Sequence, residues 1–418
     1  MREMKDSGIE WIGDIPVSWK IMPNKYLMRK EKKICPVYHG EDILSLTMKG
    51  VIVRDLDAGG KMPTSFDGYQ RLEAGNLLMC LFDIDVTPRC VGLIKQAGVS
   101  SPAYSQFVLR KGADAAYYCY YYTMLDNDKT LLHLAKNLRH SLTEDQLGAI
   151  PVIVPPIEEQ QRIADFLDTK CAEIDALTAD IQTQIDTLEQ YKRSVITETV
   201  TKGLNPDAEM KDSGIEWIGV IPAHWSIHPV YTYFGERKNK NSFGREDNLL
   251  SLSYGRVIRK DINTSDGLLP ESFNTYNIVE AGDIIIRPTD LQNDKRSLRT
   301  GLVKEHGIIT SAYIDLYPLK KVDSRYFHFL LHAYDTMKVF YNMGNGVRQG
   351  LNYSEFSRLM VFEPPYTEQI AMADYLKAKV EEVDAVISDK KAQLATLDEY
   401  KKSLIFEYVT RKKEVSVS

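Results

Sequence analysis

Met-Lys-Asp-Ser-Gly-Ile-Glu-Trp-Ile-Gly, residues 4–13, recurs without change as residues 210–219. The match continues beyond this stretch, so that 14 of the 18 positions from Met4 to Ile21 are repeated 206 residues later. Repeats of this kind define an architecture before any local pattern does. The chain of 418 residues is therefore a tandem duplication, and we expect two related globular domains.

The end of each copy is repeated as well. Residues 155–160, Pro-Pro-Ile-Glu-Glu-Gln, return as residues 364–369, Pro-Pro-Tyr-Thr-Glu-Gln, at an offset of 209. Residues 191–196 return as residues 400–405 at the same offset. Between these anchors the copies share spacing but little identity. Loops that differ on a shared frame are where specificity tends to lie, so the middles are where the two copies should differ in function.

A seven-residue apolar repeat follows each Pro-Pro pair and predicts a coiled coil. The main seam positions, seven residues apart, are Leu167, Ile174, Ile181, Leu188 and Val195 in the first copy, and Leu376, Val383, Leu397 and Leu404 in the second. The second seam position of each repeat, here called the companion position, is expected at Ile163, Leu177 and Tyr191, and at Met372, Val386 and Tyr400. Polar residues are expected in the seam at Lys170, Gln184, Lys379 and Gln393. Paired antiparallel, the two helices would form a rod. Two separate surface helices are the alternative.

Short apolar runs separated by Gly-rich turns predict strands in the middles, and helical stretches follow near residues 117–127 and 325–341. The expected fold class is α+β, with two mixed α/β domains joined by two long helices in an antiparallel coiled coil with pseudo-two-fold symmetry. The expected segments are 1–155 and 205–364 for the domains, 156–204 and 365–413 for the helices, and 414–418 for a tail. All four tryptophans fall in the repeated opening segments, where we expect them to pack in the core.

The net charge of −6 is concentrated in the central helix, since residues 156–204 carry −5 while the two domains carry +1 and −1. Any basic surface must therefore be local and balanced by acid. No apolar run approaches the roughly 18 residues of a membrane span, and the first residues have no apolar signal core, so we expect a cytoplasmic protein. The five cysteines all lie in the first copy without metal-ligand spacing, and we expect them to be reduced.

Basic side chains recur at matching places in the two copies. Lys and Arg can hold phosphates, while Arg, Asn, Gln and Asp can read base edges; for any single residue, a solvated surface charge is the simpler interpretation. The predicted DNA-binding residues are Lys30, Lys32, Lys33, Arg54, Arg89 and Arg139 in the first copy, and Arg237, Lys238, Arg256, Arg259, Lys260, Arg287, Lys295, Arg296, Arg299 and Arg348 in the second.

Two loops of different length are the strongest candidates for base reading. The first copy has Asp-Ile-Asp-Val-Thr-Pro-Arg at residues 83–89, and the second has a longer loop at residues 287–299. Because the loops change while their flanks stay in register, we predict that they carry the sequence preference of each domain.

No catalytic constellation is present in both copies. Residues 363–366, Glu-Pro-Pro-Tyr, resemble a motif of adenine methyltransferases, but the first copy has Val-Pro-Pro-Ile there and neither copy has a glycine-rich cofactor turn after a strand. No phosphate-binding loop, Ser/His/Asp set or metal cluster recurs. The sequence therefore predicts no catalytic residue and no metal site.

Taken together, these motifs resemble the specificity subunit of type I restriction-modification systems. The resemblance is carried by residues 8–13 with Ile15, Pro16 and Trp19, by the turns around Arg139 and Arg348, by Pro155-Pro156 with Glu159-Gln160, and by residues 191–196, each with its second-copy equivalent. It covers essentially the whole chain. One departure is His140-Ser141, where the second copy has Gln349-Gly350.

The resemblance implies a non-catalytic DNA reader. Each domain would recognise one half of a split, asymmetric double-stranded DNA target, and the helices would set the unread gap. Two methyltransferase subunits, which bind S-adenosylmethionine, and ATP-dependent restriction subunits would be the partners, so the chain itself would need no cofactor. The alternative is a coiled-coil scaffold that bridges proteins without reading DNA. A self-contained methyltransferase would need a cofactor pocket that the sequence lacks.

Overall fold

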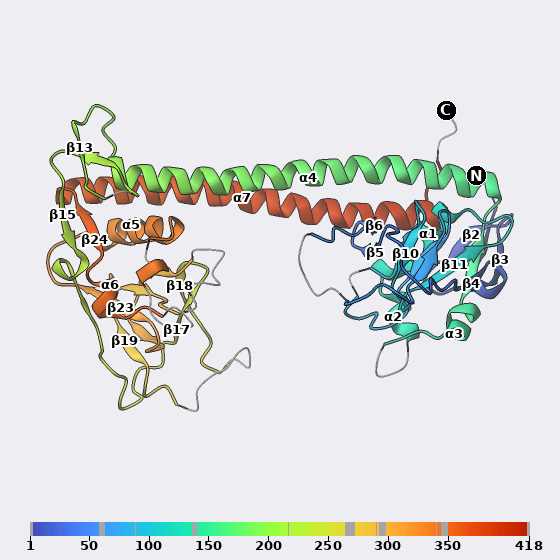
Figure 1. The fold of residues 1–418 in the computed structure, drawn as a ribbon, viewed down its shortest axis with the longest axis horizontal. Helices are drawn as coiled ribbons and strands as arrows, with labels where there is room; N and C mark the ends of the chain where they lie inside the picture. Colours follow the sequence, from blue (N-terminus) through green and yellow to red (C-terminus); the bar gives the residue numbers. More distant parts are fainter. Residues whose placement is uncertain are drawn as a thin grey trace. The chain divides into compact units, whose positions relative to one another are not determined.

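The computed structural model describes residues 3–57, 63–87, 89–135, 140–215, 217–263, 272–289, 291, 298–339, 341–343 and 350–415. The chain divides into two compact units (Figure 1). The first unit comprises Met1–Ile181 and Lys391–Ser418, and the second comprises Gln182–Lys390. Each unit therefore contains one head, residues 1–155 or 205–364, together with a part of each long helix.

A long helix begins directly after each Pro-Pro pair. Helix α4 spans Ile157–Lys202 and helix α7 spans Tyr366–Val409, with 46 and 44 residues. Proline cannot donate to a strand ladder but fits the first turn of a helix, so each pair ends the preceding strand and starts the helix. The two predicted long helices are confirmed.

The two helices pack antiparallel in both units. In the first unit, the ring of Phe166 lies 4.4 Å from that of Tyr408, and Lys401 Nζ lies 2.5 Å from Asp175 Oδ1. In the second unit, Lys192 Nζ lies 2.8 Å from Asp384 Oδ1. Residue numbers rise along α4 as they fall along α7, which establishes the antiparallel direction. The two Lys–Asp pairs are equivalent by the 209-residue offset, with the roles of α4 and α7 exchanged.

The main seam of the coiled coil is as predicted, and the companion positions Ile163 and Met372 are buried, but the other four companion positions were predicted one residue too early. Leu177 and Tyr191 are 47% and 45% exposed, and Val386 and Tyr400 are 41% and 53% exposed. In a helix, the residues three and four positions after a main seam residue both lie beside it. Leu177 and Tyr191 stand three positions after a main seam residue, and their apolar side chains led to the choice of that position in place of the fourth. The positions that do face the partner helix are Cys171, Ile185 and Lys192 in α4, and Val380, Ile387 and Lys401 in α7.

Both heads are α+β and share one strand topology. In each, the described residues form a four-stranded antiparallel sheet and four two-stranded antiparallel pairs. The first head has the order β4-β11-β8-β9 with pairs β1-β2, β3-β12, β5-β6 and β7-β10; the second has β16-β23-β20-β21 with β13-β14, β15-β24, β17-β18 and β19-β22. This repeated topology confirms the predicted fold class.

The strands and short helices have the following bounds. In the first head they are β1 Met4–Asp6, β2 Asp14–Pro16, β3 Lys20–Pro23, η1 Asn24–Tyr26, β4 Met28–Glu31, β5 Leu44–Thr47, β6 Gly50–Val53, β7 Gln70–Leu72, β8 Leu77–Met79, β9 Val91–Leu93, β10 Gly98–Ser100, β11 Ser105–Leu109, α1 Ala115–Asn127, α2 Thr130–Leu134, α3 Glu144–Ala149 and β12 Pro151–Val154. In the second head they are β13 Met210–Asp212, β14 Val220–Pro222, β15 Ser226–Pro229, η2 Val230–Thr232, β16 Phe234–Glu236, β17 Leu250–Ser253, β18 Arg256–Arg259, β19 Asn277–Val279, β20 Ile284–Ile286, β21 Thr300–Leu302, β22 Gly307–Ile309, β23 Ile314–Pro318, α5 Ser324–Thr336, η4 Tyr341–Met343, α6 Tyr353–Phe356 and β24 Met360–Glu363.

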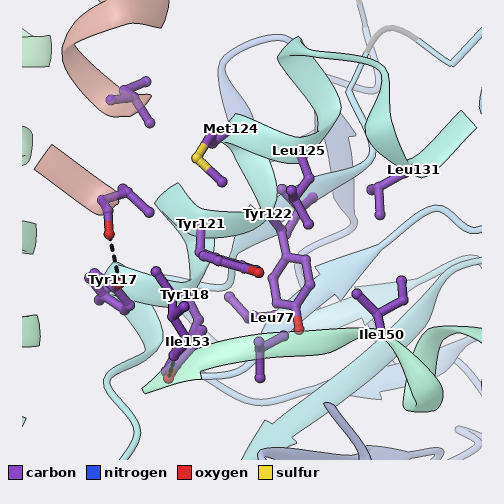
Figure 2. Packing of buried hydrophobic residues seen from close by; sticks show 14 of the residues in the cluster. Leu77, Tyr117, Tyr118, Tyr121, Tyr122, Met124, Leu125, Leu131, Ile150 and Ile153 are labelled. Atoms are coloured by element: carbon purple, nitrogen blue, oxygen red, sulfur yellow. Dashed lines mark hydrogen bonds between the residues drawn. The ribbon is translucent and has the colours of Figure 1, made fainter. Parts of the chain in front are cut away.

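Helix α1 carries four buried tyrosines, Tyr117, Tyr118, Tyr121 and Tyr122 (Figure 2). Buried tyrosine hydroxyls require partners. Tyr118 donates to Ile153 O of β12 at 3.0 Å, and Tyr122 donates to Asn24 Oδ1 at 2.6 Å. Tyr117 donates to Val409 O, at the end of α7, at 3.0 Å. The equivalent contact in the second unit joins Tyr326 to Val200 O of α4 at 3.3 Å.

The opening segment of each head is fixed to the start of its own long helix. Trp19 Nε1 donates to Glu159 Oε2 at 3.0 Å, and Trp225 Nε1 donates to Glu368 Oε2 at 3.0 Å. Both tryptophans are buried, as predicted. The same prediction is wrong for Trp217, which is 51% exposed. The five cysteines are free, in agreement with the sequence-based expectation.

Candidate nucleic-acid interface

The first-copy lysines Lys30, Lys32 and Lys33 lie on and directly after β4, the edge strand of the four-stranded sheet. All three are exposed. Lys30 Nζ lies 3.7 Å from Glu144 Oε2, and Lys33 Nζ lies 2.5 Å from Glu73 Oε1. The hydrogen bond to Glu73 raises the pKa of Lys33. Two cations of this edge, Lys30 and Lys33, are therefore already accompanied by carboxylates.

Arg54 and Arg89 are partly buried in the first unit. Arg54 follows the β5-β6 hairpin, and its backbone N–H donates to Ile43 O at 2.7 Å. Arg89 precedes β9, and its Nη1 donates to Thr123 Oγ1 of α1 at 3.4 Å. The structure thus places these two arginines on different elements from the lysines of β4.

Arg237 of the second copy is held inside the unit by carboxylates. Its Nε and Nη2 donate to Asp283 Oδ2 and Oδ1 at 2.7 and 3.0 Å, and its guanidinium lies 5.0 Å from the ring centre of Tyr317. Asp315 Oδ2 lies 3.9 Å from Arg237 Nε. Burial, followed by the charge of Asp283, raises the pKa of Asp315 to about 8. Neighbouring Lys238 is exposed, with Glu236 Oε2 2.8 Å from its Nζ.

The hairpin β17-β18 brings three predicted residues together. Its two-residue turn has positive φ at Tyr254 (48°) and Gly255 (76°), the geometry that matches the twist of a tight hairpin. Arg256 begins β18, Arg259 ends it, and Lys260 follows. Arg256 Nη2 lies 2.6 Å from Asp384 Oδ2 of α7. Arg259 forms a salt bridge with Glu305, in which its Nε donates to both carboxylate oxygens.

The glycine of β21 allows this hairpin to pack closely. A Cβ atom at Gly301 would lie 2.5 Å from Leu252 Cδ1 and 3.0 Å from Val257 Cγ2. Gly92 occupies the same place in the first head, where a Cβ atom would lie 2.8 Å from Leu46 Cδ1. The repeated glycine therefore explains how both heads hold a hairpin against the four-stranded sheet.

The second-copy loop presents one of its described arginines and buries the other. Arg287 is exposed, whereas Arg299 is 4% exposed. Arg299 Nη1 donates to Arg287 O at 3.3 Å and also to Thr289 O, and its Nε donates to Tyr341 Oη at 3.2 Å. Its guanidinium is thus bonded to protein, and Tyr341 is a partner that the sequence pattern did not indicate.

Four of the predicted residues, Arg139, Lys295, Arg296 and Arg348, lie outside the described residues. For the others, DNA contact remains a prediction. The exposed cations Lys33, Lys238, Arg256 and Arg259 each have a carboxylate within 3 Å. Exposed ion pairs contribute little to stability, so DNA phosphates could replace these carboxylates at little cost.

A hollow of about 530 Å³ in the second unit is lined by the end of α4 and by Met210, Val220 and Tyr375. Another, of about 500 Å³, is lined by Trp217, Met337, Met343 and Met360, among others. Neither is lined by a predicted DNA-binding residue. Among the described residues, no group of three or more His, Cys, Asp or Glu side chains is arranged to hold a metal ion. In the same part of the chain, no helix is both long and apolar enough to cross a membrane.

Comparisons with known proteins agree with the repeated fold. Residues 91–187, from β9 into α4, match the type I restriction modification DNA specificity domain. The chain is 25% identical over 277 residues to the putative type I restriction enzyme MjaX specificity subunit of Methanocaldococcus jannaschii, covering 63% of this chain and 60% of that protein. It is 24% identical over 278 residues to the type I restriction enzyme MjaVIII specificity subunit of the same organism, covering 61% of this chain.

The matched region spans about 60% of the length of each of these relatives. A solved chain from work on complex assembly and conformational transition of the type I R-M system is 12% identical, with a TM-score of 0.68 over 94% of this chain and 98% of that one. At this identity the structural likeness concerns the fold. The matched domain, the two relatives and the duplicated architecture agree in showing that this chain is similar to type I restriction-modification specificity subunits.

Proposed function

We propose that this chain is the DNA sequence-recognition subunit of a type I restriction-modification complex. Each head would read one half of a split, asymmetric target in double-stranded DNA, and α4 and α7 would set the spacing between the halves. The proposal rests above all on one observation: the same frame is built twice, with different cations and loops on each copy. A protein that read a symmetric target would have no need for two different heads.

The helices support the spacing role because each begins at one head's Pro-Pro pair and is continuous. A helix of 46 residues is roughly 70 Å long at 1.5 Å per residue. The equivalent Lys–Asp pairs and the Tyr–carbonyl contacts at the helix ends give each head the same attachment. Such attachment would keep the two readers in a defined relation to one another.

In this proposal the chain itself is not catalytic. Two methyltransferase subunits would bind to it and supply S-adenosylmethionine-dependent adenine-N6 methylation, and restriction subunits would supply ATP-dependent cleavage. The chain would bind neither cofactor. Because the exposed Lys33, Arg256 and Arg259 are accompanied by carboxylates, the partners would supply much of the affinity for DNA phosphates.

The direct test maps methylated adenines across the genome of a host that carries the methyltransferase subunits, with and without this chain. We expect methylation at one bipartite sequence only when the chain is present. An identical map in the two strains would contradict the proposal. Exchanging residues 83–89 and 287–299 between the copies should then change the sequence that is methylated, and an unchanged sequence would contradict the role of those loops.

A binding experiment separates this function from that of a scaffold. The chain assembled with methyltransferase subunits should bind target DNA with an affinity that falls steeply as salt rises, because phosphate contacts release counterions. A scaffold that only bridges proteins would assemble with its partners but would bind target and unrelated DNA equally weakly at every salt concentration.

A further inference from the structure

Arg299 lies at the point where the two ends of the second head's long loop meet. Its backbone C=O accepts from Arg287 N–H at 2.8 Å, which closes the loop between residues 287 and 299. Its side chain then donates to the carbonyls of Arg287 and Thr289. A single residue therefore fixes the direction in which the loop leaves the sheet.

The same guanidinium is joined to α5 and to the segment that follows it. Arg299 Nε donates to Tyr341 Oη, and the Tyr341 hydroxyl donates to Asp335 Oδ1 at 3.0 Å. Asp335 is fully buried and accepts Arg299 N–H through its other oxygen at 2.8 Å. Leu351 N–H, on the far side of the predicted Arg348 turn, donates to Pro288 O at 2.9 Å. The described ends of two predicted DNA-reading segments thus meet at one buried network.

The first head keeps the carboxylate but lacks the rest of this network. Cys90 stands in the place of Arg299, and its N–H donates to Asp126 Oδ2 at 2.9 Å. The other oxygen, Asp126 Oδ1, is buried without a hydrogen-bond partner. Leu132 stands where the second copy has Tyr341. Burying an arginine costs free energy of desolvation unless its guanidinium is well hydrogen-bonded. Since only the second head has this buried arginine, it indicates a role beyond the frame that both heads share.

We propose that Arg299 and Tyr341 are positioning residues for recognition by the second head: they hold residues 287–289, and through Pro288 also Leu351, in the arrangement that discriminates the second half-target. This inference rests on the proposed DNA-reading function. Arg299 does not contact bases in this role, because its guanidinium is buried and bonded to the protein. It acts through exposed Arg287 and through Thr289, whose carbonyls it holds.

The test uses the full chain assembled with its methyltransferase subunits. Dissociation constants are measured for the methylation-mapped target, for the same duplex with the second half altered, and for the same duplex with the first half altered. Tyr341→Phe removes one hydroxyl and keeps the ring, and Arg299→Lys keeps the charge but not the branched donor geometry. Cys90→Ala, at the equivalent place in the first head, is the matched control.

We expect each of the two variants to lower discrimination at the second half-target by roughly tenfold, as for the loss of one hydrogen bond to a charged group. Discrimination at the first half-target should stay unchanged, as it should at both halves in Cys90→Ala. A loss of folding alone would lower the active fraction equally for every duplex and leave both ratios intact. Tyr341→Phe keeps the test decisive if Arg299→Lys does not fold.

Two results would overturn the assignment: unchanged discrimination at the second half-target in Tyr341→Phe, or an equal decrease at both halves. A wild-type complex that binds all duplexes equally would instead refute the proposed DNA-reading function. The two failures are thus distinguishable by the behaviour of the wild-type complex.

Discussion

The two units share a Trp–Glu contact and a Tyr–carbonyl contact with the long helices, and they differ where polar groups are buried between strands. The Trp–Glu contact has the same length of 3.0 Å in both. In contrast, the first head pairs neutral Asn76 Nδ2 with Gln106 Oε1 at 3.2 Å, where the second head has Asp283, Asp315 and Arg237. The shared contacts build the frame, and the unshared ones make the two units respond differently to the same perturbation.

The two units also differ in their contacts with the C-terminal end of the long helix from the other copy, which is α7 in the first unit and α4 in the second. Arg411, after α7, pairs with Glu159 Oε1 at 3.0 Å, and both side chains are almost fully buried. Lys202, the last residue of α4, is the equivalent of Arg411 by the 209-residue offset, and it is exposed. Glu368, the equivalent of Glu159, is 41% exposed at its side chain and bonds His224 as well as Trp225. Equivalent carboxylates therefore have different energetic importance.

The largest expected effect comes from removing these two carboxylates in separate variants. Glu159→Ala leaves the buried Arg411 without its main counter-charge, and breaking such a pair costs about 3–5 kcal/mol. Glu368→Ala removes a half-exposed acceptor and should cost about 1 kcal/mol. Hydrogen exchange read by mass spectrometry, which reports on each unit separately, checks this difference. Equal losses of protection in the two units would contradict it.

The second expected effect concerns pH. Because the pKa of folded Asp315 is raised to about 8, the folded state keeps a proton that the unfolded state loses near pH 4. The second unit should therefore lose stability as pH rises from about 4 to about 8, by a total on the order of 5 kcal/mol, because each unit of pKa shift corresponds to about 1.4 kcal/mol. Asp315→Asn should remove this slope. Urea unfolding at several pH values measures it, and a slope that persists in the variant would exclude Asp315 as its source.

At low pH, two buried histidines also change the stability of the second unit. The effect of Asp315 is therefore measured as the difference between Asp315→Asn and the wild type. Burial lowers the pKa of His328 to about 3 and that of His332 to about 4. These groups protonate in the unfolded state first, so they destabilise the second unit as pH falls below about 6.5. The first unit has Cys119 and Thr123 at these places. Gln106→Glu should give the first unit the Asp315-like slope that it lacks.

A smaller and equal effect is expected from the two tyrosines that hold the helix ends. Tyr117→Phe and Tyr326→Phe each remove a buried hydrogen bond to a helix carbonyl, at a cost of about 1 kcal/mol. Protection from hydrogen exchange should fall by a similar factor in each unit. A loss confined to one unit would show that the repeated contact is not energetically equivalent.

The smallest expected effect is that of Arg256→Ala. Arg256 connects the β17-β18 hairpin to Asp384, which also binds Lys192, whereas the first head has Gly50 at this place. The pair is exposed, so its loss should change the stability of the second unit by less than about 1 kcal/mol. The thermal midpoint measures this, and a large decrease would reveal that the hairpin depends on the helix.

Much of the fold could be predicted from the duplication, because each strand or helix signal was present twice. The companion seam could not, because its true positions include Lys192 and Lys401, whose place in the seam depends on Asp384 and Asp175 of the other helix. Basic positions such as the β17-β18 arginines could be identified, but their partners could not. The burial of Arg299 follows from Asp335 and Tyr341, 36 and 42 residues away, and no local pattern indicates such a network.

In this account, two heads of the same fold read different half-targets. The most direct test of this is a chain in which residues 210–364 are replaced by residues 4–155. Assembled with the methyltransferase subunits in a host, it should methylate a target composed of two copies of the first half in opposite orientations. Genome-wide mapping of methylated adenines measures this. Methylation of the original asymmetric target by the replaced chain would contradict the account, because the second half would then be read without the second head.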